Sequence, residues 1–97
     1  MVQVNVTFPP ALEKTVTEAM MAALHAPRFT IIKGYGHGFA HKTRIEERIH
    51  GKSDRYLAWA LAEEKNAGPL LDFLRRHVKS HDALWWITPI IDAGALA

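Results

Sequence analysis

The sequence predicts a small α+β domain whose strands and helices follow the order β-α-β-β-α-β. Two segments carry apolar residues at helical spacing. Four other short segments alternate between apolar and polar side chains or are rich in β-branched and aromatic residues. The 97 residues suffice for a single domain, 1–97. A chain of this size buries about 60–65% of its unfolded surface, so its core is thin.

The first half of the chain predicts a strand, a helix and a second strand. Valines at positions 2, 4 and 6 alternate with polar residues, and Pro9 and Pro10 then end this strand and can open a helix. Residues 28–35 (RFTIIKGY) predict the second strand. Between the two strands, a helix that continues as far as Pro27 is indicated by Leu12, Val16, Ala19, Met20, Ala23 and Leu24.

The second half predicts a strand, a helix and a last strand. Residues 56–62 (YLAWALA) form a strand that is apolar on both faces, so both faces should be covered. The run 66–69 (NAGP) is typical of a helix start, and the apolar spacing continues to Val78. Residues 83–87 (ALWWI) predict the fourth strand, in which Trp85 and Trp86 point to opposite faces.

This order of elements is that of the ferredoxin-like fold, with an antiparallel sheet and both helices on one face. The other face would then be an exposed apolar surface, which is a liability in a monomer. We therefore expect that face to be buried against other copies of the chain. A long polar segment, about 37–54, separates the second and third strands and is expected to be a flexible loop.

Composition excludes several classes of function. The net charge of +2 is too mild for a typical nucleic-acid-binding protein. The absence of cysteine excludes disulfides and thiolate metal sites. The first ten residues lack the pattern of a signal peptide, and no apolar run is long enough to span a membrane, so a cytoplasmic protein is expected. Ser53 and Ser80 have no evident base beside them, so the chain is not expected to be an enzyme.

Two motifs carry a resemblance to a known family. KGYG, residues 33–36, ends the second strand and precedes the long polar segment. LWWITPIIDAG, residues 84–94, joins an apolar strand to Thr-Pro and an acidic residue. In order and spacing these motifs resemble the PII signalling proteins, in which a similar lysine-glycine-aromatic-glycine run opens the T-loop. The resemblance covers nearly the whole chain.

The resemblance implies a homotrimer whose sheets line its centre and which binds an adenine nucleotide (ADP, AMP or ATP) in clefts between subunits. It implies that the T-loop reports the bound state to a partner protein, a transporter or an enzyme. Some relatives bind bicarbonate as a second ligand, so bicarbonate is a possible effector here. The expected function is therefore that of a regulatory sensor.

Three departures indicate a PII-like protein rather than a standard nitrogen-regulatory one. The glycine-rich B-loop is replaced by the short link 80–82 (SHD). No basic residue follows Ile91, where the family places phosphate-binding arginines. No tyrosine lies between Tyr35 and Tyr56, where some members carry the modified tyrosine.

The candidate ligand-binding residues lie in and around the polar segment. Its glycines allow backbone N–H groups to converge on an anion, and its basic residues supply charge. From Lys33 to Arg55 there are six Lys or Arg and three Asp or Glu. Arg48 and Arg55 are the first choices for phosphate or bicarbonate, and Tyr35 for a base. The full set is Lys33, Gly34, Tyr35, Gly36, His37, Gly38, His41, Lys42, Arg44, Arg48, Lys52 and Arg55.

A divalent heavy-metal-binding protein linked to cation tolerance or efflux is the alternative. His37 and His41 are four residues apart, as are His77 and His81, and such pairs can ligate one metal ion on a helical backbone. CutA, another trimeric ferredoxin-like family, is linked to divalent cations. A solvated, unliganded loop is the simplest interpretation of the same charged and histidine residues.

Overall fold

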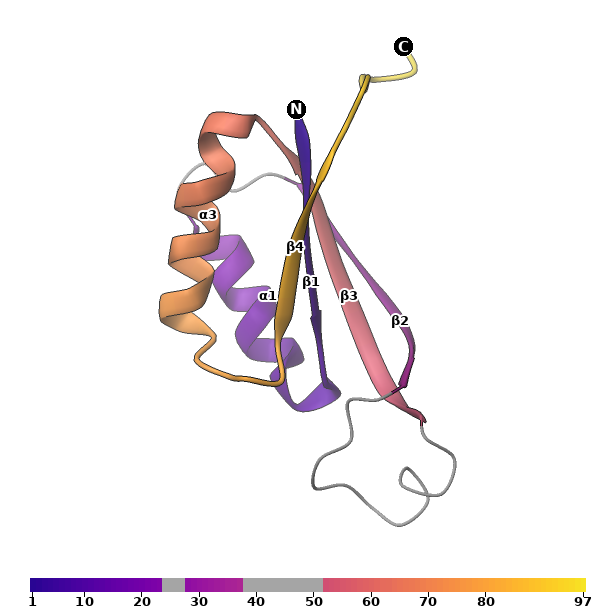
Figure 1. The fold of residues 1–97 in the computed structure, drawn as a ribbon, viewed down its shortest axis with the longest axis vertical. Coiled ribbons are helices and arrows are strands. Elements are labelled where there is room, and N and C mark those ends of the chain that lie inside the picture. The colour runs from indigo at the N-terminus through magenta and orange to yellow at the C-terminus, as the bar shows by residue number, and fades with distance from the viewer. Residues whose placement is uncertain (24–27, 38–51) are drawn as a thin grey trace.

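The computed structural model describes residues 1–23, 28–37 and 52–97 and has the predicted order of elements (Figure 1). The two helices lie together on one side of a four-stranded sheet. In chain order the elements are β1 (Val2–Phe8), a 3-10 turn η1 (Pro10–Leu12), α1 (Glu13–Ala22), β2 (Phe29–His37), β3 (Lys52–Ala62), α3 (Glu64–His77) and β4 (Leu84–Pro89).

The sheet has the strand order β2-β3-β1-β4, and every neighbouring pair is antiparallel. Each β-α-β unit is split, because β3 lies between β1 and β2, and β1 lies between β3 and β4. This is the arrangement of a ferredoxin-like fold, so the predicted fold class is confirmed.

The core fills the layer between the helices and the sheet. Alternate residues of β1 point into it, and Phe8 and Val4 are almost completely buried. The facing positions of β3 are alanines, which let the helices lie close to the sheet. The buried apolar set comprises Val2, Val4, Val6, Phe8, Val16, Ala19, Met20, Ala23, Ala58, Ala60, Ala62, Ala67, Leu70, Leu71 and Leu74.

The opposite side of the sheet, which we call the open face, is covered by neither of the two helices described, and it is apolar on β3 and β4. Its residues include Ile32, Leu57, Trp59, Leu61, Leu84 and Trp86, as the strand registers show. Ile32 is 50% exposed and Trp86 is 44% exposed. Trp85 pairs with core-facing Val6 and Trp86 with Asn5, so the two indoles point to opposite faces as predicted.

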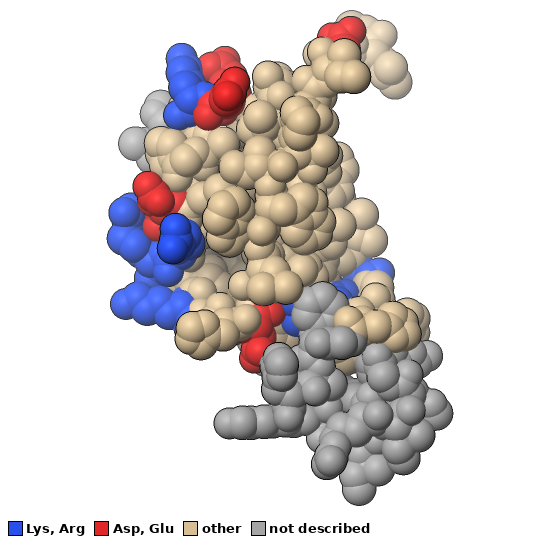
Figure 2. Space-filling view, viewed as in Figure 1, with Lys and Arg blue, Asp and Glu red and all other residues tan. Residues whose placement is uncertain are grey.

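Charged side chains avoid the strands in the view of Figure 2. Lys and Arg gather over α3, whereas the surface over the strands is mostly uncharged. Within the described ranges, no helix is long and apolar enough to cross a membrane.

The boundaries of the expected loop need correction. β2 continues to His37 and β3 begins at Lys52, so both strands enter the segment expected at about 37–54. The ladder continues because backbone pairing does not need apolar side chains, and the pairs Gly36↔Ser53 and His37↔Lys52 extend it. Residues 38–51 lie outside the described part of the chain, and with them Gly38, His41, Lys42, Arg44 and Arg48.

The helix boundaries also differ from the prediction. α1 ends at Ala22, because Ala23 is already extended, rather than continuing to Pro27. α3 begins at Glu64, ahead of the NAGP run that was expected to start it. Pro69 is therefore inside the helix, where it has no N–H to donate to the carbonyl four residues earlier. The helix continues across Pro69 to His77, and in its first turn the Asn66 N–H donates to the Glu63 oxygen at 2.9 Å.

Candidate functional site

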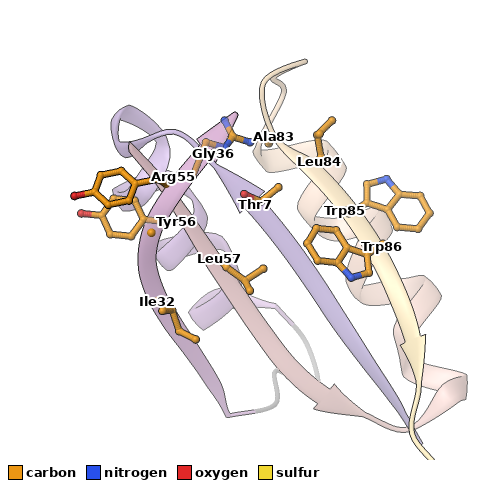
Figure 3. A pocket seen from close by; sticks show the side chains of 12 residues that line it. Thr7, Ile32, Gly36, Arg55, Tyr56, Leu57, Ala83, Leu84, Trp85 and Trp86 are labelled. Carbon is orange, nitrogen blue, oxygen red and sulfur yellow. The ribbon is translucent and has the colours of Figure 1, made fainter. Parts of the chain in front are cut away.

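A groove crosses the open face near the ends of β2 and β3 and has a volume of about 750 Å³. Four strands contribute to it, so it exists only in the folded sheet (Figure 3). Ile32 and Gly34 come from β2, Leu57 and Arg55 from β3, Thr7 from β1, and Leu84 and Trp86 from β4. We call it the sheet groove. Its volume lies within the range of small-molecule sites.

The floor of the sheet groove is mainly apolar. Leu57 and Ile32 are cross-strand neighbours, and Thr7 pairs with both Leu57 and Leu84. Trp86 lies on the same face and presents an exposed indole. A flat apolar or aromatic group would gain free energy by covering this floor, because it would remove both surfaces from water.

Arg55 provides the positive charge of the sheet groove. It is only 6% exposed, and one Nη donates a hydrogen bond of 2.8 Å to the backbone oxygen of Asp82. This contact ties β3 to the link that precedes β4, where Asp82 N–H also donates to Ser80 Oγ. Burial lowers the pKa of Arg55, and the carboxylate of Asp82 partly offsets this effect. Arg55 therefore has a structural role as well as its charge.

Gly34 and Gly36 lie in a regular strand rather than in a loop. Both belong to β2 and pair with β3, so successive N–H groups point in alternate directions and do not converge on an anion. Gly34 instead leaves space beside Arg55, its partner in the ladder. A Cβ added at Gly34 would have no neighbour within 4 Å, so this space is open to a ligand.

The other predicted residues of this region are only partly brought together. Tyr35 lies at the edge of the sheet groove and is 69% exposed, but alternation directs its side chain away from the face that Gly34 and Gly36 occupy. Lys33 and His37 are exposed and do not line the groove. Lys52 pairs with His37 at the end of the described ladder.

Two lining aromatics were not selected from the sequence. The sequence pattern places Trp86 and Tyr56 in strands without marking either as a ligand-binding residue. Tyr56 borders the groove, but its ring stacks on the core residue Phe8 with centroids 5.8 Å apart and therefore lies on the helix-facing side of the sheet. The alternation of β3 and β4 could have placed Leu57 and Trp86 on one face. Only the register across β1 shows that Thr7 brings them into one groove.

The histidine pairs are only partly within the described part of the chain. No three His, Cys, Asp or Glu residues there are arranged to hold an ion. α3 ends at His77, so His77 and His81 lack the helical backbone that their spacing requires. The His77 ring stacks on Phe73 at 4.0 Å, and its Nδ1 is 2.8 Å from the Phe73 oxygen. The first pair includes His41, outside the described residues.

Comparisons with known proteins place the chain in a family. No curated protein matches it. A crystal structure of a DUF3240 family protein from Shewanella baltica OS155 is similar, with a TM-score of 0.75 and 16% identity over 99% of this chain and 97% of that one. At this identity the likeness shows the fold. The comparisons do not tie the chain to the PII proteins. The family model described as "Protein of unknown function (DUF3240)" matches residues 1–97, and the chain therefore belongs to the DUF3240 family.

Proposed function

We propose that this protein is a PII-like regulatory sensor that binds an adenine nucleotide in the sheet groove. The observation that carries the proposal is the buried Arg55 at one end of an apolar groove with an exposed indole, Trp86. An adenine ring needs a flat apolar surface, and a phosphate needs a cation with several donors. The groove offers both, and bicarbonate would be a second, smaller anion for the same arginine.

The second part of the proposal is that the groove is completed by other copies of the chain in a homotrimer. The open face carries large apolar residues on β2, β3 and β4, whereas β1 contributes the polar residues Gln3, Asn5 and Thr7. β4 is also an edge strand, and its residues Leu84, Trp85, Trp86 and Ile87 are each 38–49% exposed. An apolar edge of this kind readily pairs or packs with another chain. The ligand would then lie in a cleft between subunits.

The third part concerns signalling. β2 and β3 lead directly from the sheet groove into residues 38–51, through the pair His37↔Lys52. A ligand beside Gly34 and Arg55 would therefore act at the base of this segment. We propose that occupancy changes how the segment meets a partner protein, a transporter or an enzyme.

The test is thermal unfolding of the purified protein with AMP, ADP, ATP and cyclic AMP, each with and without bicarbonate. A ligand at a thousand times its Kd stabilises the folded state by about 4 kcal/mol. This corresponds to a rise of well over ten degrees in Tm for a domain of this size. Zn²⁺, Cu²⁺ and Ni²⁺ belong in the same panel. A shift with metals alone would favour the histidine alternative and contradict the nucleotide proposal.

Gly34→Ala is the sharpest variant for this test. The added methyl has open space in the unliganded protein, so stability should be kept, but it fills the space beside Arg55. We expect nucleotide affinity to fall about tenfold or more, measured by isothermal titration calorimetry. The matched control is Gly94→Ala, where the new Cβ also meets nothing within 4 Å. If Gly34→Ala bound the nucleotide with unchanged affinity, the proposal that the nucleotide lies in this groove would be contradicted.

A further inference from the structure

A second groove lies on the other side of β4, between that strand and the C-terminal part of α3. Its volume is about 400 Å³. We call it the helix groove. It exists because α3 packs on α1 and β1, whereas β4 is the outer strand of the sheet. The helix-facing side of β4 is therefore partly uncovered, and Trp85 on that side is 49% exposed.

The floor of the helix groove is apolar and formed by well-packed residues. Val6, Leu71 and Leu74 are each less than 8% exposed, so their positions are fixed by the core. Trp85 forms the wall on the β4 side. An aliphatic body lying between Leu74 and Trp85 would displace water from apolar surface on two sides.

The rim of the helix groove is basic. Arg75 comes from the last turn of α3, and Lys79 and His81 follow in the link to β4. All three are exposed, and among the described residues that line the groove none is acidic. The hydroxyl of Ser80 also lies there and accepts a hydrogen bond of 3.1 Å from the Asp82 N–H. An apolar floor under a cationic rim complements an anion that has an apolar tail.

We propose that the helix groove binds a small aliphatic carboxylate, with the chain against Leu71, Leu74 and Trp85 and the carboxylate at Arg75 and Lys79. The volume lies within the range of small-molecule sites. Arginine and lysine at the rim bind the carboxylate without requiring full burial of its charge. The two grooves share Ala83, Leu84 and Trp85 around the start of β4, but their charged residues differ, because Arg55 lines only the sheet groove and Arg75 and Lys79 line only the helix groove. The inference does not depend on the nucleotide proposal.

The test is calorimetric titration of the full chain with decanoate, below its micelle-forming concentration, together with amide NMR. We expect binding to wild type and chemical-shift changes in residues 71–85. The double variant Arg75→Ala/Lys79→Ala should bind about tenfold more weakly or worse. Arg76→Ala/Lys65→Ala is the matched control, because it removes two exposed positive charges from α3 outside the groove and should leave affinity unchanged.

A neutral probe separates the role of charge from that of apolar contact. Decanol should bind more weakly than decanoate to wild type and equally to wild type and the double variant. Absence of decanoate binding, equal decanoate affinity in both double variants, or shifts confined to the sheet groove would each overturn the proposal. ATP titration of the same variants keeps the two proposals distinguishable, because Arg75 and Lys79 are remote from the nucleotide site proposed above.

Discussion

Two polar residues of the open face hold neighbouring elements together. Arg55 holds the link before β4 through the Asp82 oxygen and also supplies the charge of the sheet groove. Asn5 is a second example. It lies on the open face yet is only 2% exposed, because its amide is enclosed by hydrogen-bonding partners.

Asn5→Ala should destabilise the protein by about 1–3 kcal/mol. The Asn5 amide donates to the Trp86 oxygen at 3.3 Å and to Thr88 Oγ at 3.2 Å, and its oxygen accepts from the Gln3 amide at 3.0 Å. Removing it leaves several polar groups between β1 and β4 without their partner. Urea unfolding measures the effect. Asp72→Ala, at an exposed position on α3, is the control and should change stability by less than about 0.5 kcal/mol.

Arg55→Lys tests whether the guanidinium is needed in addition to its charge. Lysine keeps the charge but cannot present the planar fork of donors that arginine presents. We therefore expect nucleotide affinity to fall about tenfold or more in calorimetry. Loss of the Asp82 contact should also lower stability by about 1–3 kcal/mol, measured by urea unfolding without ligand. Wild-type affinity in this variant would show that Arg55 is structural only.

At the scale of elements, strands were predicted more accurately than helix ends. The period-two alternation of valines and polar residues predicted β1 with its observed bounds. The alternation is clear because one side of this strand faces the core and the other does not. The ends of β2 and β3 were missed, because Gly34, Gly36 and the polar run 52–54 carry no apolar signal and only the ladder shows that they pair. The start of α3 was misplaced because Pro69 is typical of a first turn and here occupies a later position.

Gly68→Ala should stabilise the protein by about 0.5–1 kcal/mol. Gly68 is an exposed residue inside α3, and an added Cβ would meet nothing within 4 Å. Alanine has a higher helix propensity because glycine loses more backbone freedom on folding. Thermal or urea unfolding of Gly68→Ala should show a higher midpoint than wild type. A lower midpoint would contradict this prediction and would indicate that another molecule packs closely against Gly68.

At the scale of the whole molecule, the sequence predicted the fold class and an apolar face without a helix. The sequence could not predict the sheet groove in detail, because the groove depends on the pairing registers of β1 with β3 and β4 and of β3 with β2. The helix groove had no sequence signal. Its floor is ordinary core, and its rim residues become neighbours of Trp85 only when the link after α3 turns back toward β4.

The proposed assembly gives a direct prediction. Size-exclusion chromatography with light scattering should show a trimer for wild type. Trp86→Glu places a charge on the open face and should shift the protein toward monomer, because an unpaired carboxylate is costly in an apolar interface. Met21→Glu is the control, at a 69% exposed position on α1. A monomeric wild type, or trimers of equal stability in both variants, would contradict burial of this face.

The position of β1 has a consequence for how the protein is made. β1 is synthesised before the other strands of the sheet, yet it lies inside the sheet, between β3 and β4. β4, the partner of β1 that is most distant in sequence, ends at Pro89. Beyond it, the Ile90 N–H donates to the Met1 oxygen at 3.2 Å. The sheet therefore cannot be completed until β4 has left the ribosome. Until then an edge of β1 is open to other strands, and a nascent chain that stalls before residue 84 would expose it to aggregation.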